Sequence, residues 1–114
     1  MVKYDDSDLD HVFRALADPT RRRIVAALGS GERSVGELAE PLAMSLPAVS
    51  KHLGVLERAG LLKRRRDGRT HHLRVDPAAL SPAADWIETQ RRFWEGSFDQ
   101  LATYLESAEG SAGE

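Results

Sequence analysis

The sequence of 114 residues contains no cysteine, few aromatic residues and no long apolar run. The absence of cysteine excludes disulfides and thiolate metal sites. No apolar run is long enough to span a bilayer, and the acidic start, MVKYDDSD, differs from a signal peptide. These features predict one cytoplasmic domain over residues 1–114 that does not bind a membrane.

The charges are unevenly distributed, although the formal net charge is only −2. Residues 45–75 include eight basic and two acidic residues, whereas residues 76–114 include two basic and eight acidic ones. The two segments therefore carry about +6 and −6. This separation predicts one surface that binds a polyanion and another that does not.

Apolar periodicity predicts two helices in the first third of the chain. The first is expected over about residues 8–17, where one helical stripe holds Leu9, Val12, Phe13 and Leu16. The second is expected over about residues 19–28, because Asp18 is a suitable N-cap and proline suits the first helical position.

Two serines predict the starts of the next two helices. Ser34, with Glu37 three residues later, has the spacing of a capping box and begins a short third helix. Ser45 is the expected N-cap of a fourth helix that ends near Ala59, before Gly60. The core stripe expected for this helix is Leu46, Val49, Leu53 and Leu56.

After Gly60 the pattern changes to that of a β-hairpin. Two runs, residues 61–66 and 69–75, flank Asp67-Gly68, which favours a type I′ turn. In that register Arg66 faces Arg69 and Leu62 faces Leu73. Strand alternation places Lys63 and Arg65 on one side and Arg64 and Arg66 on the other.

A last helix is expected over about residues 81–107, with apolar and aromatic residues at helical spacings. The fold class predicted for the whole chain is mainly α with a small β-hairpin, a winged helix-turn-helix of five helices and a two-stranded wing. Its expected segments are the first two helices (8–33), the helix-turn-helix (34–59), the wing (61–75), a dimerisation helix (81–107) and a frayed tail (108–114).

The helix-turn-helix followed by an arginine-rich hairpin predicts binding to double-stranded DNA. A helix fits the major groove, and a charged hairpin tip reaches neighbouring phosphates or the minor groove. No acid lies between Ser45 and Leu56 to repel phosphates. On the fourth helix the candidate contacts on the outward face and its shoulders are Pro47, Ala48, Ser50, Lys51 and His52. On the wing we expect Arg66 and Arg69 at the tip, supported by Arg64 or Arg65.

Two other classes of protein compete with this interpretation. A winged helix that binds only proteins is disfavoured by the basic segment and by the small residues that begin the fourth helix. An enzyme is disfavoured because the sequence lacks a phosphate-binding glycine loop, a Ser-His-Asp motif and a metal cluster.

Three stretches resemble the ArsR family of bacterial regulators: ALADPTRRRIVAAL, SVGELAEPLAMSLPAVSKHLGVLERAGLLKRRRDGR and RRFWEGSFDQLATYLE. The resemblance covers roughly residues 8–106. It implies a winged-helix homodimer that binds an inverted-repeat operator, usually as a repressor. The family's DNA contacts fall on Pro47, Ala48, Ser50, Lys51 and His52, with Ser45 at the start of the recognition helix.

The resemblance also implies that the first and last helices form the dimer interface. The expected interface residues are Leu9, Val12 and Phe13 of the first helix and Trp86, Phe93, Trp94, Phe98, Leu101 and Leu105 of the last. The aromatic residues of the last helix pack the core and the dimer or, alternatively, line a pocket for an unknown small-molecule effector.

The metal-sensing residues of the family are missing from this sequence. Ser34 and Gly36 stand where a metal sensor has cysteines. In the last helix Asp85 is followed two residues later by Ile87, and that helix has no histidine. His71 and His72 are adjacent on a strand and point to opposite faces. We therefore expect no metal site and no cofactor, and the resemblance is to the metal-independent branch.

Overall fold

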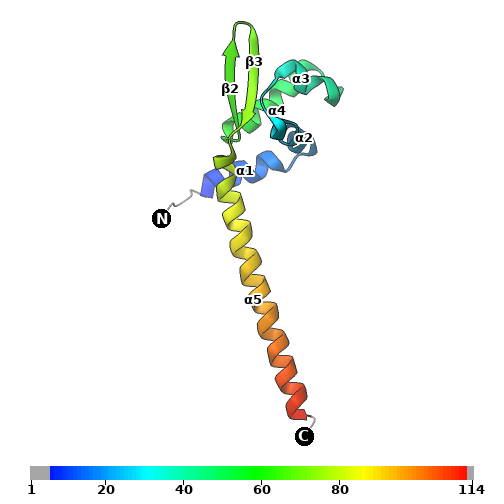
Figure 1. The fold of residues 1–114 in the computed structure, drawn as a ribbon, viewed down its shortest axis with the longest axis vertical. Helices are drawn as coiled ribbons and strands as arrows, with labels where there is room; N and C mark the ends of the chain where they lie inside the picture. Colours follow the sequence, from blue (N-terminus) through cyan, green and yellow to red (C-terminus); the bar gives the residue numbers. More distant parts are fainter. Residues whose placement is uncertain (1–5, 113–114) are drawn as a thin grey trace. The chain divides into compact units, whose positions relative to one another are not determined.

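The computed structural model describes residues 6–112, which form two compact units divided between Ala83 and Ala84. The first unit carries four α-helices and a small antiparallel sheet, and the second consists of the rest of a long helix (Figure 1). No helix among the described residues is both long and apolar enough to cross a membrane. The elements are α1 (Asp6–Leu16), α2 (Pro19–Ala27), η1 (Leu28–Ser30), β1 (Arg33–Ser34), α3 (Val35–Ala39), η2 (Glu40–Leu42), α4 (Leu46–Arg58), β2 (Leu62–Asp67), β3 (Thr70–Val75), η3 (Pro77–Leu80) and α5 (Ser81–Ala112).

The helix starts follow the capping residues in the sequence. The Asp18 carboxylate accepts a hydrogen bond from the Arg21 backbone N–H, as an N-cap does. Ser34 and Glu37 form the complete capping box, with bonds of 3.1 and 2.9 Å between each side chain and the other residue's backbone N–H. These predictions are confirmed.

Gly60 ends α4 in the left-handed conformation, with φ of +79°. Its N–H donates to the Glu57 carbonyl, and the Leu61 N–H donates to the Leu56 carbonyl. These two bonds form a Schellman motif, which turns the chain out of the helix and satisfies two helix-end carbonyls. Leu56 and Leu61 are fully buried, so the motif is anchored in the core.

The hairpin has a different turn from the one expected. The two residues outside the strands are Gly68 and Arg69, because Asp67 pairs with Thr70 at the end of the ladder. Arg66 therefore faces His71, not Arg69. Only Gly68 has a positive φ in this turn, which matches type II′ and not type I′.

This shift by one residue also moves the pairs at the base of the hairpin. Leu62 faces Val75, and Leu73 faces Arg64. A strand that the sequence analysis missed, β1, pairs with β3 and gives the sheet the order β1-β3-β2. The wing is thereby joined to the segment between α2 and α3.

The core of the first unit lies between these helices and the sheet. Buried side chains from α1, α2, α3 and α4 pack with Leu61, Leu62 and Leu73. Val49, Leu53 and Leu56 of α4 are in this core, as expected, but Leu46 is 58% exposed. Leu46 is the first helical residue of α4, and the prediction that it is a core residue is wrong.

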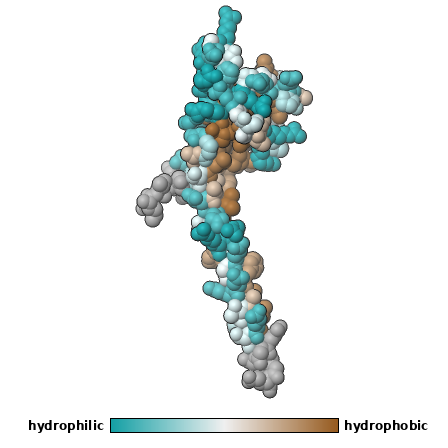
Figure 2. All heavy atoms as spheres, in the orientation of Figure 1, coloured by the Kyte–Doolittle hydropathy of each residue, from teal (hydrophilic) through white to brown (hydrophobic). Residues whose placement is uncertain are grey.

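The last helix is longer than expected. It continues to Ala112, so residues 108–112 belong to α5, and residues 113 and 114 lie outside the described part. Figure 2 shows apolar residues at several places on its surface and hydrophilic surface over the hairpin.

Candidate nucleic-acid interface

The first turn of α4 presents an exposed end. The Ser45 hydroxyl accepts a hydrogen bond from the Ala48 N–H at 3.3 Å and thereby caps the helix. Pro47, Ser50 and Lys51 are exposed, whereas Ala48 is partly buried. Lys51 has no hydrogen-bond or ion-pair partner among the described residues. The helix thus offers two side-chain donors, Ser50 and Lys51, on a surface without acidic groups.

His52, the fifth candidate on this helix, lies against another element. Its Nδ1 is 3.4 Å from Nη1 of Arg21 and 3.8 Å from a carboxylate oxygen of Asp18, and its side chain is 20% exposed. The hydrogen bond from the Arg21 backbone N–H lowers the pKa of Asp18. His52 therefore joins α4 to the start of α2.

The arginines that open α2 have a structural role that the sequence analysis missed. Arg21 donates from its guanidinium to the carbonyls of Ala15 and Arg14, at 2.6 and 2.9 Å. Arg22 donates to the Leu16 carbonyl at 2.7 Å. These carbonyls belong to the last turn of α1, where a helix runs out of its own N–H donors, and the Arg14 carbonyl also accepts from the Ala17 N–H at 3.2 Å. In the sequence, this role is indicated by the short distance between the end of the first helix and the arginine run at residues 21–23, because basic side chains near a helix C-terminus bind its last carbonyls.

Two wing arginines are held in ion pairs. Arg64 binds Glu57 of α4 with two bonds, the shorter 2.6 Å, and Arg65 binds Glu32 in the same manner. Hydrogen bonding to its carboxylate partner raises the pKa of each arginine. Arg65 also lowers the pKa of Glu32 by the same bond. The two pairs lie on opposite sides of the hairpin and attach it to α4 and to the link before β1.

The tip of the wing is less constrained. Arg66 donates from Nε to the Gly68 carbonyl at 3.0 Å, within the turn. Arg69 occupies the second turn position, is exposed, and has no hydrogen-bond or ion-pair partner in the described part of the chain. Within residues 6–112 these two guanidinium groups have no carboxylate ion-pair partner, and the same holds for Lys63 of β2 and Arg74 of β3.

Two hollows bring the candidate residues together in two groups. One, of about 540 Å³, lies between α3, α4 and the wing, and its lining includes Ser50, Arg64 and Arg69. The other, of about 290 Å³, lies between α2 and α4, and its lining includes Ala48, Lys51 and His52. Ser50 of the helix and Arg69 of the turn therefore border one hollow, although 19 positions separate them in sequence.

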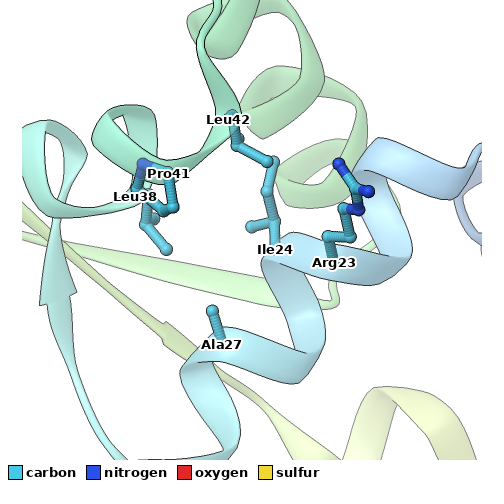
Figure 3. Close-up of a pocket in the computed structure, with 6 residues that line it drawn as sticks. All are labelled: Arg23, Ile24, Ala27, Leu38, Pro41 and Leu42. Carbon is cyan, nitrogen blue, oxygen red and sulfur yellow. The ribbon is translucent and has the colours of Figure 1, made fainter.

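A third hollow, of about 330 Å³, has different chemistry. It lies between α2 and the α3–η2 segment (Figure 3), and Ile24, Ala27, Leu38, Pro41 and Leu42 give it an apolar lining. Arg23 supplies the one charged side chain in the lining shown. This hollow holds none of the candidate DNA contacts.

The candidate dimer residues of α5 are exposed in the single chain. Trp86, Phe93, Trp94, Phe98, Leu101 and Leu105 are 49–65% exposed. The Phe93 and Trp94 rings meet edge to face, with centroids 5.4 Å apart. Arg91 lies among them and donates to Glu88 and Glu95, at 2.6 and 2.7 Å.

The candidate dimer residues of α1 differ from one another. Val12 is 2% exposed and lies in the core of the first unit, so its side chain is not available to a second chain. Leu9 and Phe13 are partly buried against that core and keep some exposed surface. The α1 part of the expected interface is therefore reduced to Leu9 and Phe13.

The described residues contain no group of three or more His, Cys, Asp or Glu side chains arranged to hold a metal ion. Ser34 caps α3, and Gly36 lies in its first turn. Both residues thus lie at the start of a helix.

The α3–α4 pair with an adjoining charged hairpin defines a winged helix-turn-helix protein. Residues 16–65 match the family described as "Helix-turn-helix domain". An HTH-type transcriptional regulator of Mycobacterium tuberculosis is 40% identical over 98 residues, which are 86% of this chain and 89% of that protein.

Two further comparisons agree. The transcriptional repressor SdpR of Bacillus subtilis is 32% identical over 69% of this chain and 88% of its own length. The crystal structure of an ArsR family transcriptional regulator superimposes with a TM-score of 0.76 at 35% identity, over 83% of this chain and 97% of that one. The chain belongs to the ArsR family of DNA-binding transcriptional regulators.

Proposed function

We propose that the protein is a homodimeric repressor that binds an inverted-repeat operator in double-stranded DNA. In this proposal α4 enters the major groove, and the wing contacts the flanking backbone or minor groove. The observation that carries it is the shared border of Ser50 and Arg69 on one hollow. A helix and a hairpin tip that border one hollow can contact neighbouring parts of one duplex.

The proposal gives the candidate residues different roles. The surface that approaches the bases is formed by the N-cap Ser45 and by four residues in the first two turns of α4: Pro47, Ala48, Ser50 and Lys51. His52 orients α4 through its contacts with α2 and reaches DNA only from the edge of this surface.

The wing residues also divide into two groups. Arg66 and Arg69 contact phosphates, because neither has a carboxylate partner within the described residues. Arg64 and Arg65 hold the wing in place through Glu57 and Glu32. They add positive charge to the interface more weakly, because their carboxylate partners offset it.

For the dimer we propose that a second copy covers the aromatic face of α5, together with Leu9 and Phe13 of α1. These aromatic and leucine side chains are half exposed and gather on one helix, and an exposed apolar patch of this kind marks a protein–protein contact surface. Phe98→Ser should therefore weaken the dimer in light scattering. Thr103→Ser, at an exposed position on the side of the helix away from these residues, is the matched control.

The proposal includes no catalytic activity, metal or cofactor. The membership of the family supports regulation of transcription, and the residues that other family members use for metal are replaced by Ser34 and Gly36. A small-molecule effector stays a prediction, with either the aromatic face of α5 or the apolar hollow beside α2 as its place.

Selection of duplexes from a random pool, followed by footprinting, tests DNA binding. The selected sites should be pseudo-palindromes with half-sites about one helical turn apart. Arg69→Ala should lower the salt slope of binding by about 2 in a dimer, one phosphate contact for each chain. Arg92→Ala, on the exposed surface of α5, should leave the slope unchanged. Failure to enrich any duplex would contradict the proposal and favour a protein-binding winged helix.

A further inference from the structure

Leu46 is an exposed leucine at the start of an otherwise well-packed helix. It is 58% exposed, while the three core residues of the same helix, Val49, Leu53 and Leu56, are completely buried. Its position on the helix is close to the direction of Leu53, seven residues later, but it lies one turn beyond the end of the core. The core therefore does not explain why this position carries a large apolar side chain.

The surroundings of Leu46 limit what it can contact. Ser45 and Pro47 beside it are exposed, and Ser50 and Lys51 continue the same uncharged or basic surface. The Ser45 hydroxyl is engaged in capping the helix, and Pro47 has no N–H to donate. Leu46 thus places an exposed, purely apolar side chain at the start of α4, one turn before Ser50.

We propose that Leu46 contacts the 5-methyl group of a thymine in the major groove and selects thymine at one position of each half-site. This inference rests on the proposed entry of α4 into that groove. Among the four base pairs, the thymine methyl is the apolar group that the major-groove edge displays. A leucine against a donor or acceptor of another base would remove water from it without replacing its hydrogen bond.

The expected effect is set by one buried methyl group. Removing that methyl should weaken binding about fourfold in each half-site. Because the two half-sites are far apart, the effects should multiply to about 15-fold for a dimer.

Uracil replaces thymine in the test, because uracil lacks only the methyl group and keeps the same hydrogen-bonding edge. An operator selected from a random pool by the unaltered protein is synthesised with uracil at each thymine pair in turn. Dissociation constants are measured for the unaltered protein, Leu46→Ala and Lys51→Ala. Light scattering and thermal melting of Leu46→Ala verify that its oligomeric state and fold are unchanged.

The unaltered protein should lose about 15-fold in affinity at one symmetric pair of thymines. Leu46→Ala should bind the original operator about 15-fold more weakly than the unaltered protein does, and uracil at those positions should not weaken its binding further. Lys51→Ala should bind more weakly but remain sensitive to uracil. If the unaltered protein binds the operator tightly but is insensitive to uracil at every position, the inference about Leu46 is wrong, while the proposed DNA binding stands.

Three other results would also overturn it. Leu46→Ala that keeps the uracil sensitivity shows that another residue reads the methyl group. A change of oligomeric state in Leu46→Ala shows that the side chain contacts the second chain. Absence of binding to every duplex overturns the proposed function itself, and with it this inference.

Discussion

Replacing Leu53 by alanine is expected to destabilise the first unit strongly. Leu53 is completely buried at the centre of the core, between α4 and the other helices. Removing a buried leucine side chain to its Cβ costs about 2 to 5 kcal/mol, which includes both the lost transfer free energy and the cavity left behind. A middle value of about 3 kcal/mol is a large part of the 5 to 15 kcal/mol that stabilises a typical domain.

The measurement is thermal unfolding followed by circular dichroism, with all proteins at one concentration because a dimer melts at a concentration-dependent temperature. A loss of about 3 kcal/mol corresponds to a fall of roughly 12 to 24 °C in Tm for a unit of this size. Leu46→Ala is the matched control, since it is the same change in the same helix at an exposed position. We expect it to change stability by less than about 0.5 kcal/mol. Equal destabilisation by both variants would refute the assignment of Leu46 to the surface.

Two more predictions concern the backbone and pH. Gly60→Ala should cost about 1 to 2 kcal/mol of unfolding free energy because φ is +79° there, whereas Gly29→Ala, in open space without a positive φ, should be neutral or stabilising in the same urea titration. The backbone N–H bonds that hold the pKa values of Asp18 and Glu37 below their ordinary 3.8 and 4.5 contribute stability that is complete above about pH 4.5. That stability should be lost as the pH falls through the lowered pKa values. Between about pH 6 and pH 3 the unfolding free energy of Glu37→Gln should therefore fall less than that of the unaltered protein, and an equal fall in both proteins would contradict this.

The local features of the fold could be predicted because neighbouring residues determine them. The caps at Asp18, Ser34 and Ser45 and the positive φ at Gly60 each follow from one side chain acting on nearby backbone. The family membership followed from the string around α4, which combines these caps with its buried stripe.

The errors arose where distant residues decide the outcome. The turn was predicted one residue too early. Asp67-Gly68 and Gly68-Arg69 both suit a two-residue hairpin turn, and the pairing of β2 with β3 leaves Gly68-Arg69 in the turn. Leu46 fits the helical period of a core residue, yet the core ends before it. Val12 fits both a core and an interface, and periodicity alone does not separate them.

For the candidate interface, the sequence predicted the helix and the hairpin that form it, but not most of the contacts between their side chains. The sequence indicates which helix and hairpin carry the charge. It does not indicate that Glu57 and Glu32, far from Arg64 and Arg65 along the chain, pair with them. Nor does it show that His52 lies against Asp18 and Arg21, because that contact depends on how α2 and α4 pack.

The two carboxylates on the wing have a consequence for how such a regulator searches a genome. Each of Glu57 and Glu32 offsets one guanidinium that would otherwise attract any stretch of phosphate backbone. A binder with less unspecific attraction spends less time on the millions of competing sites, so its occupancy of the operator depends more on contacts with bases. The acidic partners of the wing therefore contribute to its selectivity, because they reduce binding to non-specific DNA and leave more of the protein available to reach the operator.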